Sequence, residues 1–180
     1  MLGMRTAALV IAAISAFMVS CGPGNPDQRG HADSSMSAQG MGDANATIPG
    51  ADSLVFTDTI RLKANENMHF DHELFKVRAG QKLGLIFTNT GAKSSSSMAH
   101  NVVILRNGTD LADFADIART AKAESYVPAS LDSLVIAHTK LVAGGEADTL
   151  QFVLPRAAVY DFICSFPGHW GTMQGKIVAK

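Results

Sequence analysis

A short segment near the C-terminus places the strongest constraint on how this chain can fold. It carries Cys164, His169 and Met173 in the spacing Cys-x4-His-x3-Met. Two imidazoles, one thiolate and a weak axial methionine form a copper site of the electron-transfer type. Pro167 and Gly168 favour a sharp turn, so the cysteine and the histidine can face one ion. The segment holds no second histidine, so the fold must bring one from elsewhere.

His100 is the best candidate for that second imidazole. It follows a serine-rich loop and opens an apolar run, residues 102–105, that is typical of a buried strand. Taken alone, each candidate has an ordinary interpretation. Cys164 could be a buried inert thiol, Met173 a core residue and His100 a core or loop histidine. Their combined pattern favours the metal site.

Two of these motifs, in this order, resemble the azurins, small blue copper proteins of the cupredoxin group. The first is His100-Asn101 before an apolar strand, and the second is Cys-x-Phe-Pro-Gly-His-x3-Met at the C-terminus. Residues 135–146 are also similar to the azurin segment that precedes the last strands. The resemblance covers the chain from about residue 54 to the end. It implies one type 1 copper ion held by His100, Cys164, His169 and Met173.

The azurin resemblance also implies that residues next to the ligands influence the properties of the copper ion. The backbone N–H groups of Asn101 and Phe166 are expected to donate to the cysteine sulfur. Ala99 stands where azurins have a glycine whose carbonyl approaches the copper, so it is a possible weak axial ligand. A methyl group there requires a negative φ. Asn89, counted back from His100 without a gap, replaces an azurin histidine that titrates with the redox state, so we expect a reduction potential that varies little with pH.

Alternating and apolar runs between turn signals predict an all-β, Greek-key cupredoxin sandwich of about eight strands. The expected strands are residues 54–62, 74–77, 82–90, 100–105, 133–138, 149–154, 158–164 and 173–179, and residues 67–71 also alternate briefly. Residues 110–123 change to helical spacing. They predict one short helical insertion with Thr109 or Asp110 as its N-cap.

The N-terminal part of the chain predicts export and anchoring rather than a core. Residues 1–20 are typical of a lipoprotein-type signal peptide, because Arg5 precedes an apolar stretch too short to span a membrane comfortably. Residues 18–21 resemble a bacterial lipobox with Met18 in place of leucine, so Cys21 is the expected lipidation site. An ordinary signal peptide followed by a stray thiol is the alternative.

Residues 21–52 predict a flexible tether, because they are rich in Gly, Ser and Ala and have few large apolar side chains. His31, Met36 and Met41 could form a weak copper-catching tract, but a linker of mixed small residues is the simpler interpretation. Residues 53–180 then form the azurin-like domain. We expect it at the bacterial cell envelope, periplasmic or otherwise extracytoplasmic, anchored to a membrane by lipid on Cys21.

Composition and site chemistry predict an electron carrier rather than an enzyme. The 15 basic and 16 acidic residues nearly balance, so the chain lacks the charge excess of nucleic-acid-binding proteins. The motifs hold no acid/base pair for a small-molecule substrate, and six histidines are too few for a multicopper enzyme. Expected partners are c-type cytochromes or oxidase and reductase complexes. A copper storage or delivery module is the alternative function.

Two further groups of residues stand near or outside the copper motif. Pro167 and Trp170 flank His169, the ligand that we expect to be exposed, and so predict a patch for docking partners. Shielding of the imidazole ring is the alternative role of Trp170. His69 and His72 look like a metal pair, but strand alternation puts positions three apart on opposite faces, which favours a surface role.

Overall fold

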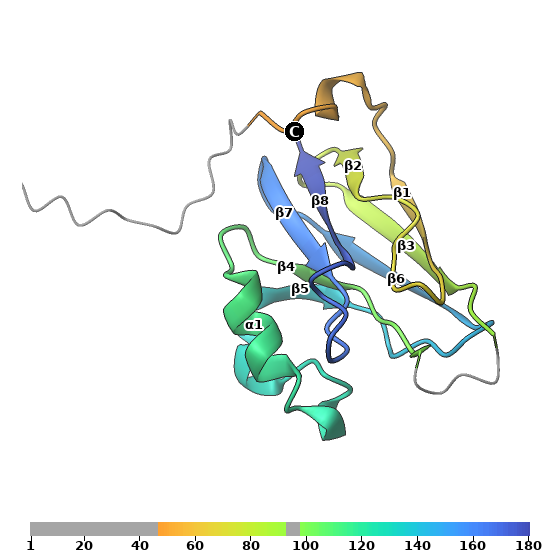
Figure 1. The fold of residues 1–180 in the computed structure, drawn as a ribbon. Helices are drawn as coiled ribbons and strands as arrows, with labels where there is room; N and C mark the ends of the chain where they lie inside the picture. The colour runs from red at the N-terminus through yellow and green to blue at the C-terminus, as the bar shows by residue number, and fades with distance from the viewer. Residues whose placement is uncertain (1–46, 93–97) are drawn as a thin grey trace, which may run out of the picture. The chain divides into compact units, whose positions relative to one another are not determined.

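The computed structural model describes residues 47–92 and 98–180 (Figure 1). The expected signal peptide, Cys21, His31, Met36, Met41 and most of the expected tether lie outside these residues. The end of the expected tether belongs to the described structure, since Ala51 is buried in a 3-10 helix, η1 (Ala51–Ser53). Within the described part of the chain, no helix is long and apolar enough to cross a membrane.

Eight strands of the described residues form two sheets (Figure 1). A three-stranded sheet has the order β1-β3-β6 and a five-stranded sheet has the order β2-β8-β7-β4-β5. The strands are β1 (Thr59–Ala64), β2 (Leu74–Val77), β3 (Lys82–Asn89), β4 (Val103–Leu105), β5 (Val135–His138), β6 (Ala147–Val153), β7 (Ala158–Ile163) and β8 (Gln174–Ala179). Strands β1 and β3 pair in parallel, as do β2 and β8, and the other pairs are antiparallel.

The main hydrophobic core lies between the two sheets, as strand alternation predicts. Along β1 the buried side chains are Ile60, Leu62 and Ala64, and along β3 every second residue from Leu83 to Asn89 is buried. Aromatic rings meet them from the five-stranded sheet, where Phe162 lies 5.5 Å from Phe70 between ring centroids. The all-β sandwich predicted from the sequence is confirmed.

One short α-helix interrupts the strands, also as predicted. Helix α1 (Leu111–Ala118) has Asp110 as its N-cap, whose carboxylate accepts hydrogen bonds from two N–H groups of the first turn. The helix ends earlier than residue 123, because the N–H groups of Thr120 and Ala121 bond to carbonyls three residues back. The short 3-10 helices η3 (Lys122–Glu124) and η4 (Ala129–Leu134) follow.

Helix α1 and the segment after it bury a second, smaller cluster against β4 and β7. Its buried members are Val103, Leu105, Phe114, Ala118, Val127 and Ile163. Because Val103 and Ile163 are cross-strand partners, this cluster packs on the two strands that lead to the candidate ligands. The insertion therefore supports the end of the sandwich that carries the copper motif.

The predicted first strand begins five residues too early. Val55 is 85% exposed and Phe56 makes only an isolated bridge to Lys76, so regular pairing starts at Thr59. The Phe56 ring lies beneath two cations, with Lys76 Nζ 5.0 Å and Arg78 Cζ 4.4 Å from its centroid. These cation–π contacts explain how an apolar residue is accommodated outside the core.

Other predicted strands differ as well, since β5 starts two residues later and β6 two residues earlier than expected. Residues 67–71 form no strand, because Met68 adopts a left-handed φ of 56° that breaks the extended backbone. His100 also lies outside β4 and instead forms an isolated antiparallel bridge with Val142. The strand itself starts at Val103.

Candidate metal centre

The loop of residues 164–173 joins β7 to β8 and is closed by its own backbone. Cys164 directly follows β7, and its N–H donates to the Met173 carbonyl at 2.9 Å. Within the loop, the His169 N–H donates to the Phe166 carbonyl and the His169 carbonyl accepts from Met173 N–H. Gly168 supplies the left-handed residue of the turn, with φ of 84°. The local turn predicted from Pro167 and Gly168 is confirmed.

His100 reaches this loop from a different part of the chain. Its N–H donates to the Val142 carbonyl at 3.1 Å, and its carbonyl accepts from the Val142 N–H at 2.8 Å. This two-way pairing fixes the backbone of His100 beside residues 164–173. The side chains of His100, Cys164 and His169 are 0%, 0% and 4% exposed.

Three potential ligand atoms converge in this buried space. The Nδ1 atoms of His100 and His169 are 3.1 Å apart, and Cys164 Sγ lies 4.0 Å from the first and 3.7 Å from the second. Among the described residues, these three form the group of His, Cys, Asp or Glu side chains able to hold a metal ion. The structure thus brings together three of the four residues that the sequence singled out as ligands.

These separations fit a single ion. A metal that binds nitrogen at about 2.0 Å and thiolate sulfur at about 2.3 Å can reach two nitrogens up to about 4.0 Å apart, and a nitrogen and a sulfur up to about 4.3 Å apart. All three observed distances are within these limits. Two imidazoles and a thiolate also form the donor set that suits copper.

Burial keeps all three ligand groups neutral when no metal is bound. It raises the pKa of Cys164 to about 11, against the effect of backbone N–H groups of Asn101 and Phe166 that stabilise the thiolate. Burial, and secondarily repulsion from His100, lowers the pKa of His169 to about 4. The His169 lone pair therefore stays available in mild acid, while a metal must displace the thiol proton of Cys164.

The other ring nitrogen of His100 is held differently. Burial lowers the pKa of this residue, and the backbone of Asn65 opposes that effect. Even so, Nε2 is buried without forming a regular hydrogen bond. The ring orientation therefore depends on packing and on the backbone of His100.

Asn101 links the two ligand-bearing segments. Its Oδ1 accepts a hydrogen bond from the Ser165 N–H at 2.9 Å, and its Nδ2 donates to Ser165 Oγ at 2.9 Å. Ser165 lies beside Cys164 and Asn101 beside His100, so this buried pair sets the distance between the segments. Nothing in the spacing of the sequence singled out Ser165, because its role depends on a partner 64 residues away.

The remaining predicted site residues lie around the cluster. Met173 is fully buried in the same core as Cys164. Ala99 is not among the described residues with positive φ, so its methyl group is accommodated. Pro167 is exposed, and Trp170 is half-buried against the second cluster beside α1. Part of the indole is thus used for packing within the protein.

His169 is not the exposed ligand that the sequence suggested. It is only 4% exposed, because the ring of Phe166 packs on it with a centroid distance of 4.7 Å. Tyr126 packs in turn on Phe166 at 5.1 Å between centroids. The sequence could not reveal this cover, since Tyr126 comes from the segment between η3 and η4, about 40 residues before Phe166.

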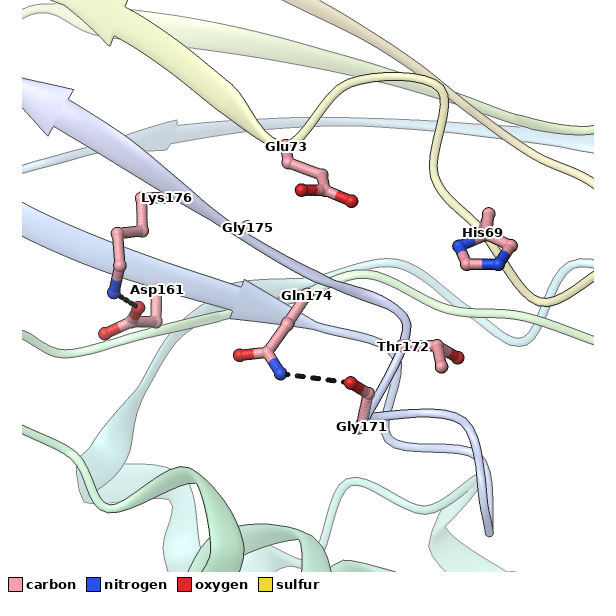
Figure 2. Close-up of a pocket in the computed structure, with 8 residues that line it drawn as sticks. All are labelled: His69, Glu73, Asp161, Gly171, Thr172, Gln174, Gly175 and Lys176. Atoms are coloured by element: carbon pink, nitrogen blue, oxygen red, sulfur yellow. Dashed lines mark hydrogen bonds and ion pairs between the residues drawn. The ribbon is translucent and has the colours of Figure 1, made fainter. Parts of the chain in front are cut away.

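His69 and His72 lie outside the cluster. Figure 2 shows His69 at one side of an open pocket beside the loop of residues 164–173, with Glu73 nearer the middle and the Asp161–Lys176 ion pair at the far side. His72 is exposed and contacts Asp71. None of the three candidate ligands lines this pocket, and both His69 and His72 are exposed, which agrees with a surface role for the two histidines.

Comparisons with known proteins agree with this site. The model of the family "Copper binding proteins, plastocyanin/azurin family" matches residues 57–180. The chain is 33% identical to an azurin of Alcaligenes faecalis over 122 residues, which are 66% of this chain and 94% of that protein. It is 34% identical to outer membrane protein H.8 of Neisseria gonorrhoeae, with 64% of each chain covered.

A solved structure extends the match to three dimensions. Auracyanin A, a "blue" copper protein of Chloroflexus aurantiacus, superposes with a TM-score of 0.61 and 32% identity, over 70% of this chain and 100% of that one. The resemblance inferred from the sequence motifs is confirmed, as is copper as the cofactor. The chain belongs to the plastocyanin/azurin family of copper binding proteins.

Proposed function

We propose that this protein is a type 1 (blue) copper carrier that shuttles one electron between redox partners at the cell envelope. His100, Cys164 and His169 supply two imidazoles and a thiolate, and Met173 is the weak axial ligand. The observation that carries the proposal is the convergence of both Nδ1 atoms and the sulfur within 4.0 Å of one another, in a buried position.

Copper in such a site carries one electron by changing between Cu(II) and Cu(I). The role of the protein is to hold the copper ligands in one arrangement for both oxidation states, because any change of geometry adds to the activation barrier for electron transfer. The closed backbone of residues 164–173 and the Asn101–Ser165 pair serve this purpose. A rigid, buried ligand set favours electron transfer over storage or delivery, which require copper to enter and leave readily.

The surroundings of the sulfur tune the same site. Backbone N–H groups of Asn101 and Phe166 stabilise negative charge on Cys164. Pro167 follows and has no N–H, so the loop adds no donor at that position. Each hydrogen bond to the sulfur withdraws negative charge from it. Because the loop provides few such donors, more of the negative charge on the sulfur is available for bonding to copper. Ala99 remains a candidate for a weak contact through its carbonyl.

Partners exchange electrons, in this proposal, through the surface above His169. Pro167 and Gly168 are exposed at the turn, and Phe166 and Trp170 are half-buried beside it. Apolar and aromatic side chains with few charges favour docking of protein partners. c-type cytochromes and oxidase or reductase complexes are partners of suitable chemistry, whereas nucleic acid is not.

Voltammetry and the visible spectrum of the copper-loaded protein test the function. We expect a strong thiolate-to-copper band in the red and a reversible one-electron couple. The potential should change little between about pH 5 and 8, because buried Asn89 cannot gain a proton in the range where histidine titrates.

A protein that binds copper without the band or the reversible couple would support storage or delivery instead. A clear slope of potential against pH would show that another group, such as His69 or His72, senses the copper charge. That outcome is compatible with electron transfer. It contradicts the expectation that Asn89, in place of a titrating histidine, makes the potential nearly independent of pH.

We also propose that lipid on Cys21 holds the protein at a membrane of the cell envelope. The lipobox-like residues 18–21 and the tether-like composition of residues 22–51 support this. A match to an outer membrane protein of Neisseria gonorrhoeae is compatible with it. A flexible tether would confine the domain near membrane-bound partners and raise their effective concentration.

Replacing Cys21 by alanine in the full chain is expected to release the protein from membranes. The reason is that the lipid is the anchor and needs the thiol for its attachment. Cell fractionation measures the release, and mass spectrometry of the membrane-extracted wild type should find acyl chains on Cys21. Cys164→Ser, at the only other cysteine, is the matched control and should remain with membranes. A soluble wild-type protein that begins at another residue contradicts the anchoring.

A further inference from the structure

Asn89 is a polar residue in a position that the strand pattern assigns to the core. Buried positions alternate along β3 and are occupied by Leu83, Leu85, Phe87 and then Asn89, which is 0% exposed. A buried amide is costly unless its hydrogen bonds are formed. The buried Asn89 amide at the end of β3 therefore needs specific hydrogen-bond partners.

The Asn89 side chain has three such partners, two of them on other segments of the chain. Its Nδ2 donates to the Met98 carbonyl at 2.8 Å and to the Val142 carbonyl at 3.0 Å. Its Oδ1 accepts from the Gly91 N–H at 2.9 Å. Both protons of the amide are thus used, and both go to backbone carbonyls.

Both carbonyls belong to residues close to the candidate ligand His100, one along the chain and one across a backbone pairing. Met98 precedes His100 by two residues along the chain. Val142 is the residue whose N–H and carbonyl both pair with the backbone of His100, at 2.8 and 3.1 Å. A single amide therefore holds the approach of the chain to His100 and also the segment against which His100 is paired.

The backbone of Asn89 is also held by hydrogen bonds. The Asn89 N–H donates to the Glu146 carbonyl at 2.9 Å, and the Asn89 carbonyl accepts from Gly145 N–H at 2.8 Å. The segment that follows packs closely on the side chain, since a Cβ atom on Gly91 would lie only 3.0 Å from Asn89 Oδ1.

We propose that Asn89 is a positioning residue that sets the location of the His100 imidazole relative to Cys164 and His169. Among the described residues, His100 Nε2 has no partner with regular hydrogen-bond geometry, although the backbone of Asn65 acts on the ring. The location of the ring therefore depends strongly on the backbone of His100, to which Asn89 is linked through the Met98 and Val142 carbonyls. The inference rests on the proposed copper function, since it concerns the same ligand set.

The test compares Asn89→Leu with a matched variant, Asn107→Leu, in the copper-loaded protein. Asn107 also donates its amide to a backbone carbonyl, that of Val159 at 2.7 Å, but in the turn after β4. Both changes remove a structural hydrogen bond and lower stability. We expect only Asn89→Leu to alter the relative intensities of the thiolate-to-copper bands and to weaken copper binding by about 10- to 100-fold, as loss of a ligand's support does.

A second variant, Asn89→Ser, covers the case in which leucine prevents folding. Serine retains one donor, so we expect a smaller change of the same spectrum and a smaller loss of copper affinity. Wild-type spectra and affinity in the folded Asn89 variants would overturn the proposal, and so would equal spectral changes in Asn107→Leu. A wild-type protein that lacks the blue band would instead contradict the proposed function.

Discussion

Replacing Cys164 with serine is expected to abolish the blue absorption and leave a folded β-sandwich that binds copper weakly. Only a thiolate gives the intense charge-transfer band, and Cys164 is the thiol that lies next to both Nδ1 atoms in the described part of the chain. A hydroxyl is a much poorer ligand for copper than a thiolate. Absorption spectroscopy of the copper-loaded variant measures the loss, and circular dichroism measures the fold.

The fold should survive because the new hydroxyl has hydrogen-bond partners available. The backbone N–H groups of Asn101 and Phe166 that act on the sulfur can donate to serine Oγ instead, so the buried oxygen is not left unpaired. Cys21→Ser is the matched control, since it changes the other cysteine and should keep the full colour. A blue Cys164→Ser protein would show that the assignment of the ligand is wrong.

Replacing Gly175 with alanine is expected to cause the largest loss of stability in the sheets. Gly175 in β8 faces Phe162 in β7, and a Cβ atom there would overlap the Phe162 ring and lie 2.6 Å from the Glu73 carbonyl oxygen. That carbonyl cannot move freely, because it accepts the Lys176 N–H at 2.8 Å. Overpacking of this kind costs about 3 kcal/mol.

Thermal unfolding of the metal-free protein measures this effect without the contribution of bound copper. A loss of about 3 kcal/mol corresponds to a decrease in Tm of roughly 10 °C for a domain of this size. Gly84→Ala in β3 is the control, because its Cβ would meet Thr59 only at an ordinary distance of 3.6 Å. It should leave Tm unchanged or raise it slightly. Equal melting temperatures of the two variants would contradict the packing described here.

The candidate site was largely predictable where its signals are local. The turn between Cys164 and His169 depends on Pro167 and Gly168, which favour the same backbone in any fold. The cap of α1 by Asp110 and the alternation in β1 and β3 are local in the same sense. Such features follow from side-chain and backbone preferences over a few residues.

Predictions failed where a distant contact overrides a local preference. Residues 54–58 have strand-like composition, but Phe56 lies beneath Lys76 and Arg78 and Val55 remains exposed, so pairing begins later. The burial of His169 has the same origin, because its cover depends on Phe166 and on Tyr126 from the segment between η3 and η4. The residue pattern of one segment does not predict which side chain of another segment will cover it in the folded protein.

The sequence by itself determined the ligand types, their order and the kind of sheet that carries them, because these depend on residue chemistry and short-range periodicity. Only the tertiary structure decided which ring nitrogens face the sulfur, how the site is covered, and that Asn89 and Ser165 hold its two halves. These features join residues about 10 to 70 positions apart, from Asn89–Met98 to His100–His169. Hydrogen bonds and packing across such separations exist only once both sheets have closed on the core.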